Sequence, residues 1–122
     1  MSHPTLTGRR VLLVEDEPLV GMLIEELLLD EGCIVLGPYA TLAEALAAAQ
    51  AEDFDVALLD VNLRGEKIYP VAEIVEARGI PFLLLTGYGP DAIPHDRPNW
   101  HACSKPFEVD VLLRLLVERL EA

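Results

Sequence analysis

The sequence predicts a single α/β domain with a parallel five-stranded sheet that is covered by helices on both faces. Short, nearly continuous apolar runs alternate along the chain with longer segments whose apolar residues recur at helical spacing. The runs lack the polar alternation of half-exposed strands, which is typical of parallel strands buried on both faces. The chain shows no repeat, linker or second domain, so we expect residues 9–122 to form the domain and residues 1–8 a flexible N-terminal tail.

The predicted strands are the short apolar runs of the chain. They lie at residues 10–14, 33–36, 55–59, 81–85 and 100–103. Their length decides the assignment, because runs this short fit a buried strand better than a helix. The last of the five has the weakest pattern, since a histidine interrupts it.

The ends of the predicted helices are marked by residues that favour helix ends. These helices span residues 18–31, 41–51, 69–78 and 107–121. Pro18 opens the first helix at a position where a missing N–H has no consequence, and Gly32 ends it. Thr41 and Glu44 form a capping box at the start of the second helix. Gly79 stops the third.

The segment from residue 87 to residue 104 breaks the alternation of strands and helices. It contains Pro90, Pro94 and Pro98, and prolines at this spacing leave no room for a regular helix interior. We therefore expect a loop with at most one helical turn before the fifth strand.

The overall charge narrows the classes of partner. The chain carries a formal net charge of −12, and a uniform polyanion repels nucleic acid and acidic membrane surfaces, so we expect neither as a partner. Divalent cations and basic protein surfaces are better candidates. No apolar run is long enough to span a bilayer, and the first residues lack the apolar stretch of a secretory signal. A cytoplasmic location is therefore expected.

Polar residues follow the ends of four predicted strands. They are Glu15 and Asp16 after the first strand, Asp60 after the third, Thr86 after the fourth and Lys105 after the fifth. Ligands of open α/β sheets bind beyond the carboxyl ends of the strands, where these side chains would converge. The alternative interpretation is that strand ends are polar simply because they meet water.

The types of residue at these strand ends fit phosphoryl transfer. Three carboxylates packed together repel one another, so the site needs a cation, and hard oxygen ligands in an open cleft favour Mg²⁺. A carboxylate beside the metal can attack phosphorus and become an acyl phosphate. The metal and a lysine ammonium would neutralise charge on the phosphoryl oxygens, and a threonine hydroxyl can hydrogen-bond one of them.

Four stretches of the chain together resemble the receiver domain of bacterial two-component response regulators. They are VLLVEDEP, LLDVNLRGE, LLLTGYG and SKPF, and the resemblance extends from about residue 9 to the end of the chain. It implies the flavodoxin-like (βα)5 receiver fold with strand order 2-1-3-4-5. The stretch PFLLLTGYG further resembles the subgroup known as FAT GUY receivers. These are often free-standing, pair with kinases of the HWE or a related type, and can have a mobile loop in place of the fourth helix.

The resemblance implies a role for each residue at the strand ends. Asp60 would be the phosphoacceptor and Mg²⁺ its cofactor. The metal ligands would be Asp16, Asp60, the backbone carbonyl of Asn62 and, through water, Glu15. Thr86 and Lys105 would bind the phosphoryl group, with a cis peptide bond between Lys105 and Pro106.

One position departs from the family pattern. Receivers place an aromatic residue three positions before the lysine, whereas this chain has Ala102 at that position. Tyr88, two residues after the threonine, is the alternative switch aromatic. We hypothesise that it and the 87–99 loop become ordered when Asp60 is phosphorylated. Gly87 is expected to keep access to the acceptor open.

Two apolar pairs lie off the core-facing stripes of their predicted helices. Leu19 and Met22 are a candidate surface for docking the helical hairpin of a kinase. Val111 and Leu115 are a candidate surface for a homodimer or another partner. The alternatives are partial burial and ordinary surface aliphatics.

Together these features predict a single-domain response regulator. It would accept a phosphoryl group from a sensor histidine kinase or a phosphotransfer protein and signal through conformational change and binding of a downstream protein. It would not be an enzyme with a separate substrate, although it would catalyse its own phosphorylation and dephosphorylation. The alternatives are a pseudo-receiver used only for protein interaction, a flavodoxin-type cofactor binder and a haloacid-dehalogenase-type phosphatase. The cofactor binder lacks its Gly-rich loop here, and the phosphatase would have an acid at the position of Asn62.

Overall fold

The computed structural model describes residues 3–87 and 92–122. Its strands are β1 (Arg10–Val14), β2 (Ile34–Tyr39), β3 (Val56–Asp60), β4 (Asn62–Leu63), β5 (Glu66–Lys67), β6 (Phe82–Thr86) and β7 (Ala102–Ser104). Its helices are a short 3-10 helix, η1 (Pro4–Leu6), and α1 (Pro18–Asp30), α2 (Leu42–Ala51), α3 (Tyr69–Ala77) and α4 (Val109–Glu121). Every predicted strand and helix is present. In the ranges that the structure describes, no helix has the length and apolar character needed to cross a membrane.

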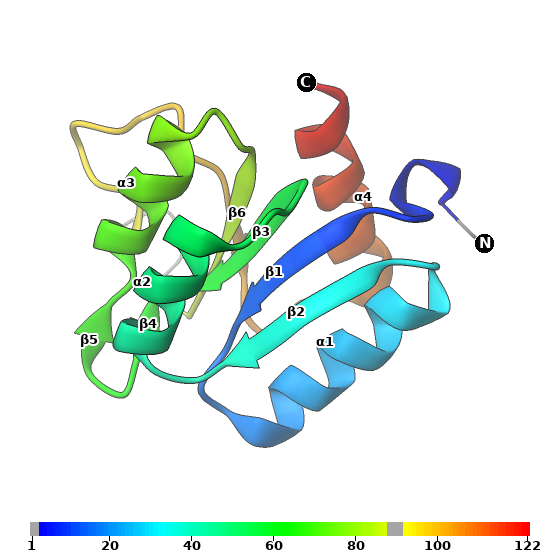
Figure 1. Cartoon of the computed structure of the whole chain (residues 1–122), viewed down its shortest axis with the longest axis horizontal. Coiled ribbons are helices and arrows are strands. Elements are labelled where there is room, and N and C mark those ends of the chain that lie inside the picture. Colours follow the sequence, from blue (N-terminus) through cyan, green and yellow to red (C-terminus); the bar gives the residue numbers. More distant parts are fainter. Residues whose placement is uncertain (1–2, 88–91) are drawn as a thin grey trace.

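The main sheet has the strand order β2-β1-β3-β6-β7, and each neighbouring pair of strands is parallel. Since β6 and β7 are the fourth and fifth strands of this sheet along the chain, the predicted order 2-1-3-4-5 is confirmed. Helices α2 and α3 lie on one side of the sheet, and α1 and α4 on the other (Figure 1). The fold is therefore the flavodoxin-like α/β fold, with helices on both faces.

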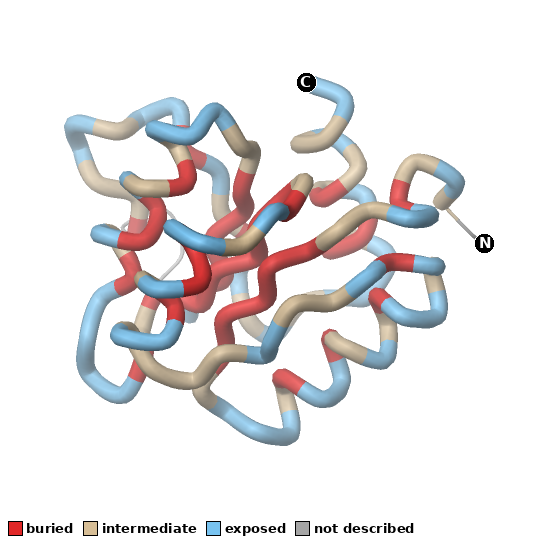
Figure 2. Tube along the Cα trace, viewed as in Figure 1, coloured by how far each residue is buried: buried red, intermediate tan, exposed pale blue. Residues whose placement is uncertain are grey.

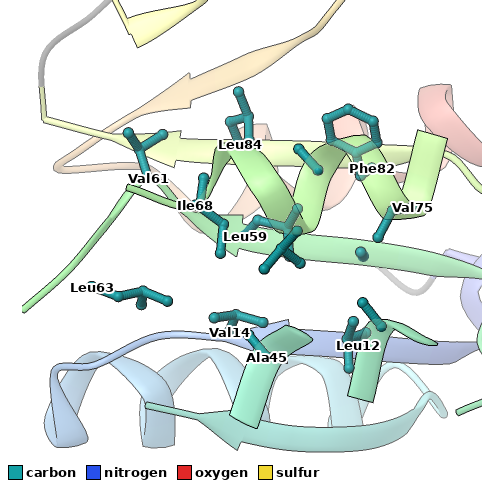
Figure 3. Packing of buried hydrophobic residues seen from close by; sticks show 14 of the residues in the cluster. Leu12, Val14, Ala45, Leu59, Val61, Leu63, Ile68, Val75, Phe82 and Leu84 are labelled. Atoms are coloured by element: carbon teal, nitrogen blue, oxygen red, sulfur yellow. The ribbon is translucent and has the colours of Figure 1, made fainter. Parts of the chain in front are cut away.

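Each face of the sheet builds its own hydrophobic cluster. Leu12 and Val14 of β1 pack on the face of α2 and α3, while Val11 and Leu13 pack on the face of α1 and α4. Buried residues run along the central strands (Figure 2), and Figure 3 shows the cluster beneath α2 and α3 at close range. Strands β3 and β6 are buried at every residue, which explains their continuous apolar sequences.

The edge strand β2 has a bulge beside the end of β1, where the parallel register between the two strands shifts. Gly37 lies in this bulge with a φ of +106°, and a Cβ there would lie 2.4 Å from the carbonyl oxygen of Leu13. Beyond the bulge, the N–H of Glu15 donates to the carbonyl of Tyr39 at 2.9 Å. The bulge therefore fixes the backbone of the first acidic residue after β1.

The described residues before β1 are folded onto the domain, whereas the sequence predicted a flexible tail for this segment. Leu6 is completely buried in the cluster beneath α1 and α4, and burial of one leucine contributes about 1.5–3 kcal/mol. The ring Nδ1 of His3 lies 2.9 Å from a carboxylate oxygen of Glu31. The Thr5 hydroxyl donates to a carboxylate oxygen of Glu121 at 3.0 Å. The segment thus links the ends of α1 and α4 around a buried side chain.

The described residues between β6 and β7 contain no α-helix, in agreement with the predicted loop. They are attached to α3, because the Tyr69 hydroxyl donates to the carbonyl of Ala92. The indole N–H of Trp100 donates to a carboxylate oxygen of Glu76 at 2.6 Å. The Trp100 ring packs edge-on against Phe82, with 5.2 Å between the ring centroids. This part of the segment is therefore anchored at both of its ends.

Candidate functional site

Three carboxylates gather at the carboxyl edge of the main sheet. Glu15 and Asp16 directly follow β1, and Asp60 is the last residue of the adjacent strand β3. One oxygen atom from each carboxylate lies within 4.8 Å of the others. Glu15 and Asp60 are only 2% and 4% exposed, whereas Asp16 is half-buried. The fold thus brings together three acids that the sequence placed at two different strand ends.

Lys105, which follows β7, supplies positive charge to this cluster. Its Nζ lies 3.1 Å from Oε1 of Glu15 and 3.2 Å from Oδ2 of Asp60. Its backbone N–H donates to the carbonyl of Thr86 at 2.7 Å, and the Lys105–Pro106 peptide bond is cis. Burial disfavours the ammonium, but the carboxylates of Asp60 and Glu15 outweigh this effect and raise the pKa of Lys105. The side chain is therefore a stable cation.

The pKa of Asp60 is strongly raised by the surroundings of its carboxyl group. Burial and the neighbouring Glu15 carboxylate raise the pKa of Asp60 to about 8, although Lys105 acts in the opposite direction. Asp16 behaves differently: burial acts to raise its pKa, but hydrogen bonds, led by the one from the backbone N–H of Arg64, outweigh this and lower it. One ammonium does not balance three carboxylates, so negative charge at the site remains uncompensated.

The residues present fit a hard divalent cation. Carboxylate oxygens are the ligands that Mg²⁺ prefers, and three of them are already close enough to share one ion. The added charge would offset the burial and the Glu15 carboxylate that raise the pKa of Asp60. A cavity of about 210 Å³ opens beside the cluster and is lined by Asp16, Glu17, Asp60, Asn62, Gly87 and Lys105.

Strands β4 and β5 form a small hairpin directly after Asp60, which we did not predict from the sequence. The turn residues Arg64 and Gly65 have φ values of +52° and +89°, as in a type I′ hairpin. The Arg64 N–H donates to Oδ2 of Asp16 at 2.9 Å, and the Gly65 N–H donates to Oδ1 of Asn62 at 3.0 Å. The glycine in the turn was the only signal in the sequence, since flanking pairs this short show no strand pattern.

The other predicted site residues occupy different positions around the cluster. Thr86 is buried at the end of β6, and Gly87 is exposed and lines the cavity. A Cβ at Gly87 would meet no described atom within 4 Å, so only a side chain larger than a methyl group can test the expected obstruction. The Asn62 N–H donates to Oδ1 of Asp60 at 3.3 Å, while the metal-binding role of its carbonyl stays a prediction. Tyr88 lies outside the described residues.

The apolar pair predicted on α1 is exposed to solvent. Leu19 is 81% exposed and Met22 54%. The neighbouring Leu23, which the helical spacing of apolar residues assigns to the core-facing stripe, is 48% exposed. We call these three residues the α1 patch. A cavity of about 420 Å³ adjoins the patch and is lined by Glu17, Val20, Leu23, Lys105, Pro106 and Phe107. An open apolar surface thus continues from α1 to the lysine of the acidic site.

The apolar pair predicted on α4 is less open than expected. Val111 and Leu115 are half-buried, because both pack against the cluster beneath α1 and α4. This corrects the prediction of an exposed patch at these two residues. The core-facing surface of α4 is wider than the sequence stripe indicated.

The domain combines a flavodoxin-like sheet with buried carboxylates and a paired lysine at the carboxyl edge of that sheet. This combination of fold and site is that of a receiver domain. The model of the response regulator receiver domain matches residues 11–116. The chain therefore belongs to the response regulator receiver domain family.

Individual relatives agree with this assignment. The chain is 35% identical over 109 residues to the transcriptional regulatory protein PdtaR of Mycobacterium tuberculosis, which covers 86% of this chain and 53% of PdtaR. It spans about half the length of the curated relatives that it matches.

Solved structures show the same relationship. The BeF3-activated conformation of SdrG from Pseudomonas melonis Fr1 is 38% identical, with a TM-score of 0.75, and the match covers 98% of this chain and 99% of SdrG. This likeness is consistent with the FAT GUY subgroup. The receiver domain of a sensor histidine kinase from Pseudomonas aeruginosa PAO1, which has a magnesium ion in its active site cleft, is 26% identical. Its TM-score is 0.80, and the match covers 95% of this chain and 100% of that domain.

Proposed function

We propose that this domain is a single-domain phosphoacceptor switch of the cytoplasm. Asp60 would take a phosphoryl group from a histidine kinase or a phosphotransfer protein in the presence of Mg²⁺, and the phosphorylated domain would bind a downstream protein. The observation that carries this proposal is the position of Asp60, which shares its site with two other carboxylates and lies 3.2 Å from the ammonium of Lys105. The domain would catalyse its own phosphorylation and dephosphorylation rather than act on a separate substrate.

The proposed transfer uses groups that are already in place. A carboxylate oxygen of Asp60 attacks the phosphorus atom of a phosphohistidine on the donor. The new P–O bond forms as the P–N bond breaks, and the imidazole nitrogen of the donor leaves with the bonding electron pair. The Lys105 ammonium is placed to neutralise a phosphoryl oxygen. The switch resets when water attacks the same phosphorus atom and Asp60 leaves as a carboxylate.

Asp16, Asp60 and the carbonyl of Asn62 would hold Mg²⁺, with Glu15 acting through water. When bound, the ion supplies positive charge that balances the carboxylates and the oxygens of the transferring group. The magnesium ion in the active site cleft of the similar Pseudomonas aeruginosa domain supports this assignment. The raised pKa of Asp60 supports it as well, because the acceptor needs added positive charge to be fully ionised at neutral pH.

The α1 patch supports a partner that presents an apolar helical face. Its residue Leu23 also lines the cavity that reaches Lys105, so a helix seated on the patch would lie directly beside the acceptor site. In this proposal the partner is the helical hairpin of an HWE-type histidine kinase, whose histidine would then approach Asp60.

Replacement of Leu19 by glutamate is expected to slow phosphoryl transfer from the phosphorylated hairpin of such a kinase by about 10-fold or more, since loss of a central anchor residue costs about 2 kcal/mol or more and about 1.4 kcal/mol is a factor of ten. Transfer from acetyl phosphate should not change, because that donor does not use the patch. Leu29→Glu is the matched control. Leu29 is 53% exposed on the same helix, but it lies about 15 Å further along the axis. Equal rates for the two variants with the kinase donor would contradict this docking surface.

The function itself is tested by incubating the domain with Mg²⁺ and acetyl phosphate and recording the intact mass. We expect the addition of a single phosphoryl group, and no addition without Mg²⁺. A titration with beryllofluoride and Mg²⁺, followed by NMR, detects a complex at the acceptor even if the acyl phosphate is short-lived. If neither the adduct nor the complex forms, the proposal fails and the pseudo-receiver interpretation takes its place.

A further inference from the structure

The β4–β5 hairpin, residues 62–67, lies between the acceptor strand and the acid that follows β1. It begins two residues after Asp60, and its turn donates a backbone hydrogen bond to Asp16. Arg64 and Asp16 are 48 positions apart in the sequence. The hairpin therefore connects the two strands that supply the acidic cluster by a route other than the sheet itself.

The hairpin is held firmly by the protein core. Leu63 and Ile68, on either side of the turn, are 1% and 0% exposed and belong to the cluster beneath α2 and α3. The Ile68 N–H also donates to the carbonyl of Val61 at 2.9 Å. Because both ends of the hairpin are fixed, its turn can hold a neighbouring side chain in a defined orientation.

Asp16 is a side chain that needs such support. It is half-buried beside two other carboxylates, and their repulsion favours rotation of its own carboxylate toward solvent. The Arg64 N–H holds Oδ2 at 2.9 Å, and the carboxylate offers its second oxygen as a ligand for a cation. Groups that orient a metal ligand in this way typically change metal affinity by about 10- to 100-fold when they are lost.

We propose that the β4–β5 hairpin is the positioning element of the metal site: the backbone N–H of Arg64 orients Asp16 for Mg²⁺, and Gly65 permits the turn that places this N–H. The inference rests on the proposed function in so far as Mg²⁺ is the resident cation. Since the effects of two linked events are reciprocal, Mg²⁺ should in turn stabilise the Arg64 hydrogen bond.

The conformation of Gly65 provides a sharp test. Its φ is +89°, yet a Cβ at this position would meet nothing within 4 Å. A side chain is therefore restricted by the backbone conformation and not by space. Asparagine tolerates this left-handed conformation, whereas β-branched valine does not. Gly65→Asn and Gly65→Val thus add side chains into the same open space and differ in whether the turn survives.

The experiment is a calorimetric titration with Mg²⁺ of the wild type and both variants. It is combined with hydrogen exchange of the Arg64 amide and with urea unfolding in the absence of Mg²⁺. We expect Gly65→Asn to bind like the wild type and Gly65→Val to bind about 10-fold more weakly. We also expect Mg²⁺ to slow exchange of the Arg64 amide in the wild type and in Gly65→Asn.

Three outcomes would overturn the proposal. Equal affinity of the wild type and a folded Gly65→Val variant would remove the role of the turn and leave the proposed function intact. If the wild type binds Mg²⁺ but hydrogen exchange of its Arg64 amide does not change, the positioning role is also removed and the proposed function stays intact. This outcome can be read even if the valine variant fails to fold. A wild type that does not bind Mg²⁺ would overturn both the positioning role and the metal site of the proposed function.

Discussion

Asp60→Asn is expected to abolish phosphoryl incorporation from acetyl phosphate and, at the same time, to make the metal-free domain more stable. The neutral amide is a poor nucleophile and cannot form the acyl phosphate. It also removes one of three crowded carboxylates, while Lys105 keeps its contact with Glu15 at 3.1 Å. We expect a gain in the free energy of unfolding at neutral pH on the order of 1–3 kcal/mol.

The pH dependence of stability tests whether the ionised Asp60 carboxylate is what destabilises the metal-free domain. The pKa of Asp60 is about 8 in the folded domain against an ordinary value of 3.8, so the folded state holds the proton more tightly than the unfolded state. Below pH 3.8, Asp60 is therefore protonated in both states and does not destabilise the fold. As the pH rises from 3.8 toward about 8, Asp60 lowers the free energy of unfolding by a growing amount. Urea unfolding without Mg²⁺ should show a wild type that loses stability relative to Asp60→Asn between mildly acid and neutral pH.

Asp53→Asn serves as the control for both measurements. The Asp53 side chain is 97% exposed, so its replacement should alter neither phosphoryl incorporation nor stability to a measurable degree. Incorporation that persists in Asp60→Asn would contradict the assignment of the acceptor. A variant that loses stability would contradict the account of carboxylate crowding, whatever happens to phosphorylation.

Gly37→Ala is expected to destabilise the domain by about 2–4 kcal/mol, the largest loss that we expect from removing a single glycine. The added methyl group would have to occupy space 2.4 Å from the Leu13 carbonyl oxygen, in a backbone conformation that alanine rarely adopts. Relief of this clash would separate β2 from β1 and move the Tyr39 carbonyl away from the Glu15 N–H. Chemical unfolding of the wild type and the variant measures the loss.

Gly79→Ala separates the steric effect from the conformational one. Gly79 has a φ of +73°, but a Cβ there would meet nothing within 4 Å. This variant should lose only about 1 kcal/mol. Similar losses for the two variants would show that the close approach to Leu13 has little effect on stability.

The fold could be predicted from the sequence because its strands are buried on both faces and its helices carry clear end signals. Thr41 illustrates this: its hydroxyl accepts from the Glu44 N–H at 3.2 Å, as the capping box predicts. Features that depend on tertiary contacts were missed. Nothing in the sequence around Leu6 indicates that η1 folds back into the core, since one leucine among polar residues has no periodicity.

The site could be predicted at the level of its side chains but not of its backbone. Asp16, Asp60 and Lys105 follow predicted strands, and the parallel order of those strands brings them together. The hydrogen bond from Arg64 to Asp16 depends on the β4–β5 hairpin. Each strand of this hairpin has two residues, which is too short to show a strand pattern in the sequence. The α1 patch was found only in part, because Leu23 lies at a position that the helical stripe assigned to the core.

Trp100 gives this protein an intrinsic optical reporter. It is the only tryptophan of the chain, and the residue is 4% exposed, with its indole N–H hydrogen-bonded to the carboxylate of Glu76. Its emission therefore depends on how the segment before β7 sits on α3, at a distance from the sheet edge that holds Asp60. A shift in the fluorescence spectrum on addition of beryllofluoride would show, without any label, that the surroundings of Trp100 on the α3 side of the sheet respond to this ligand.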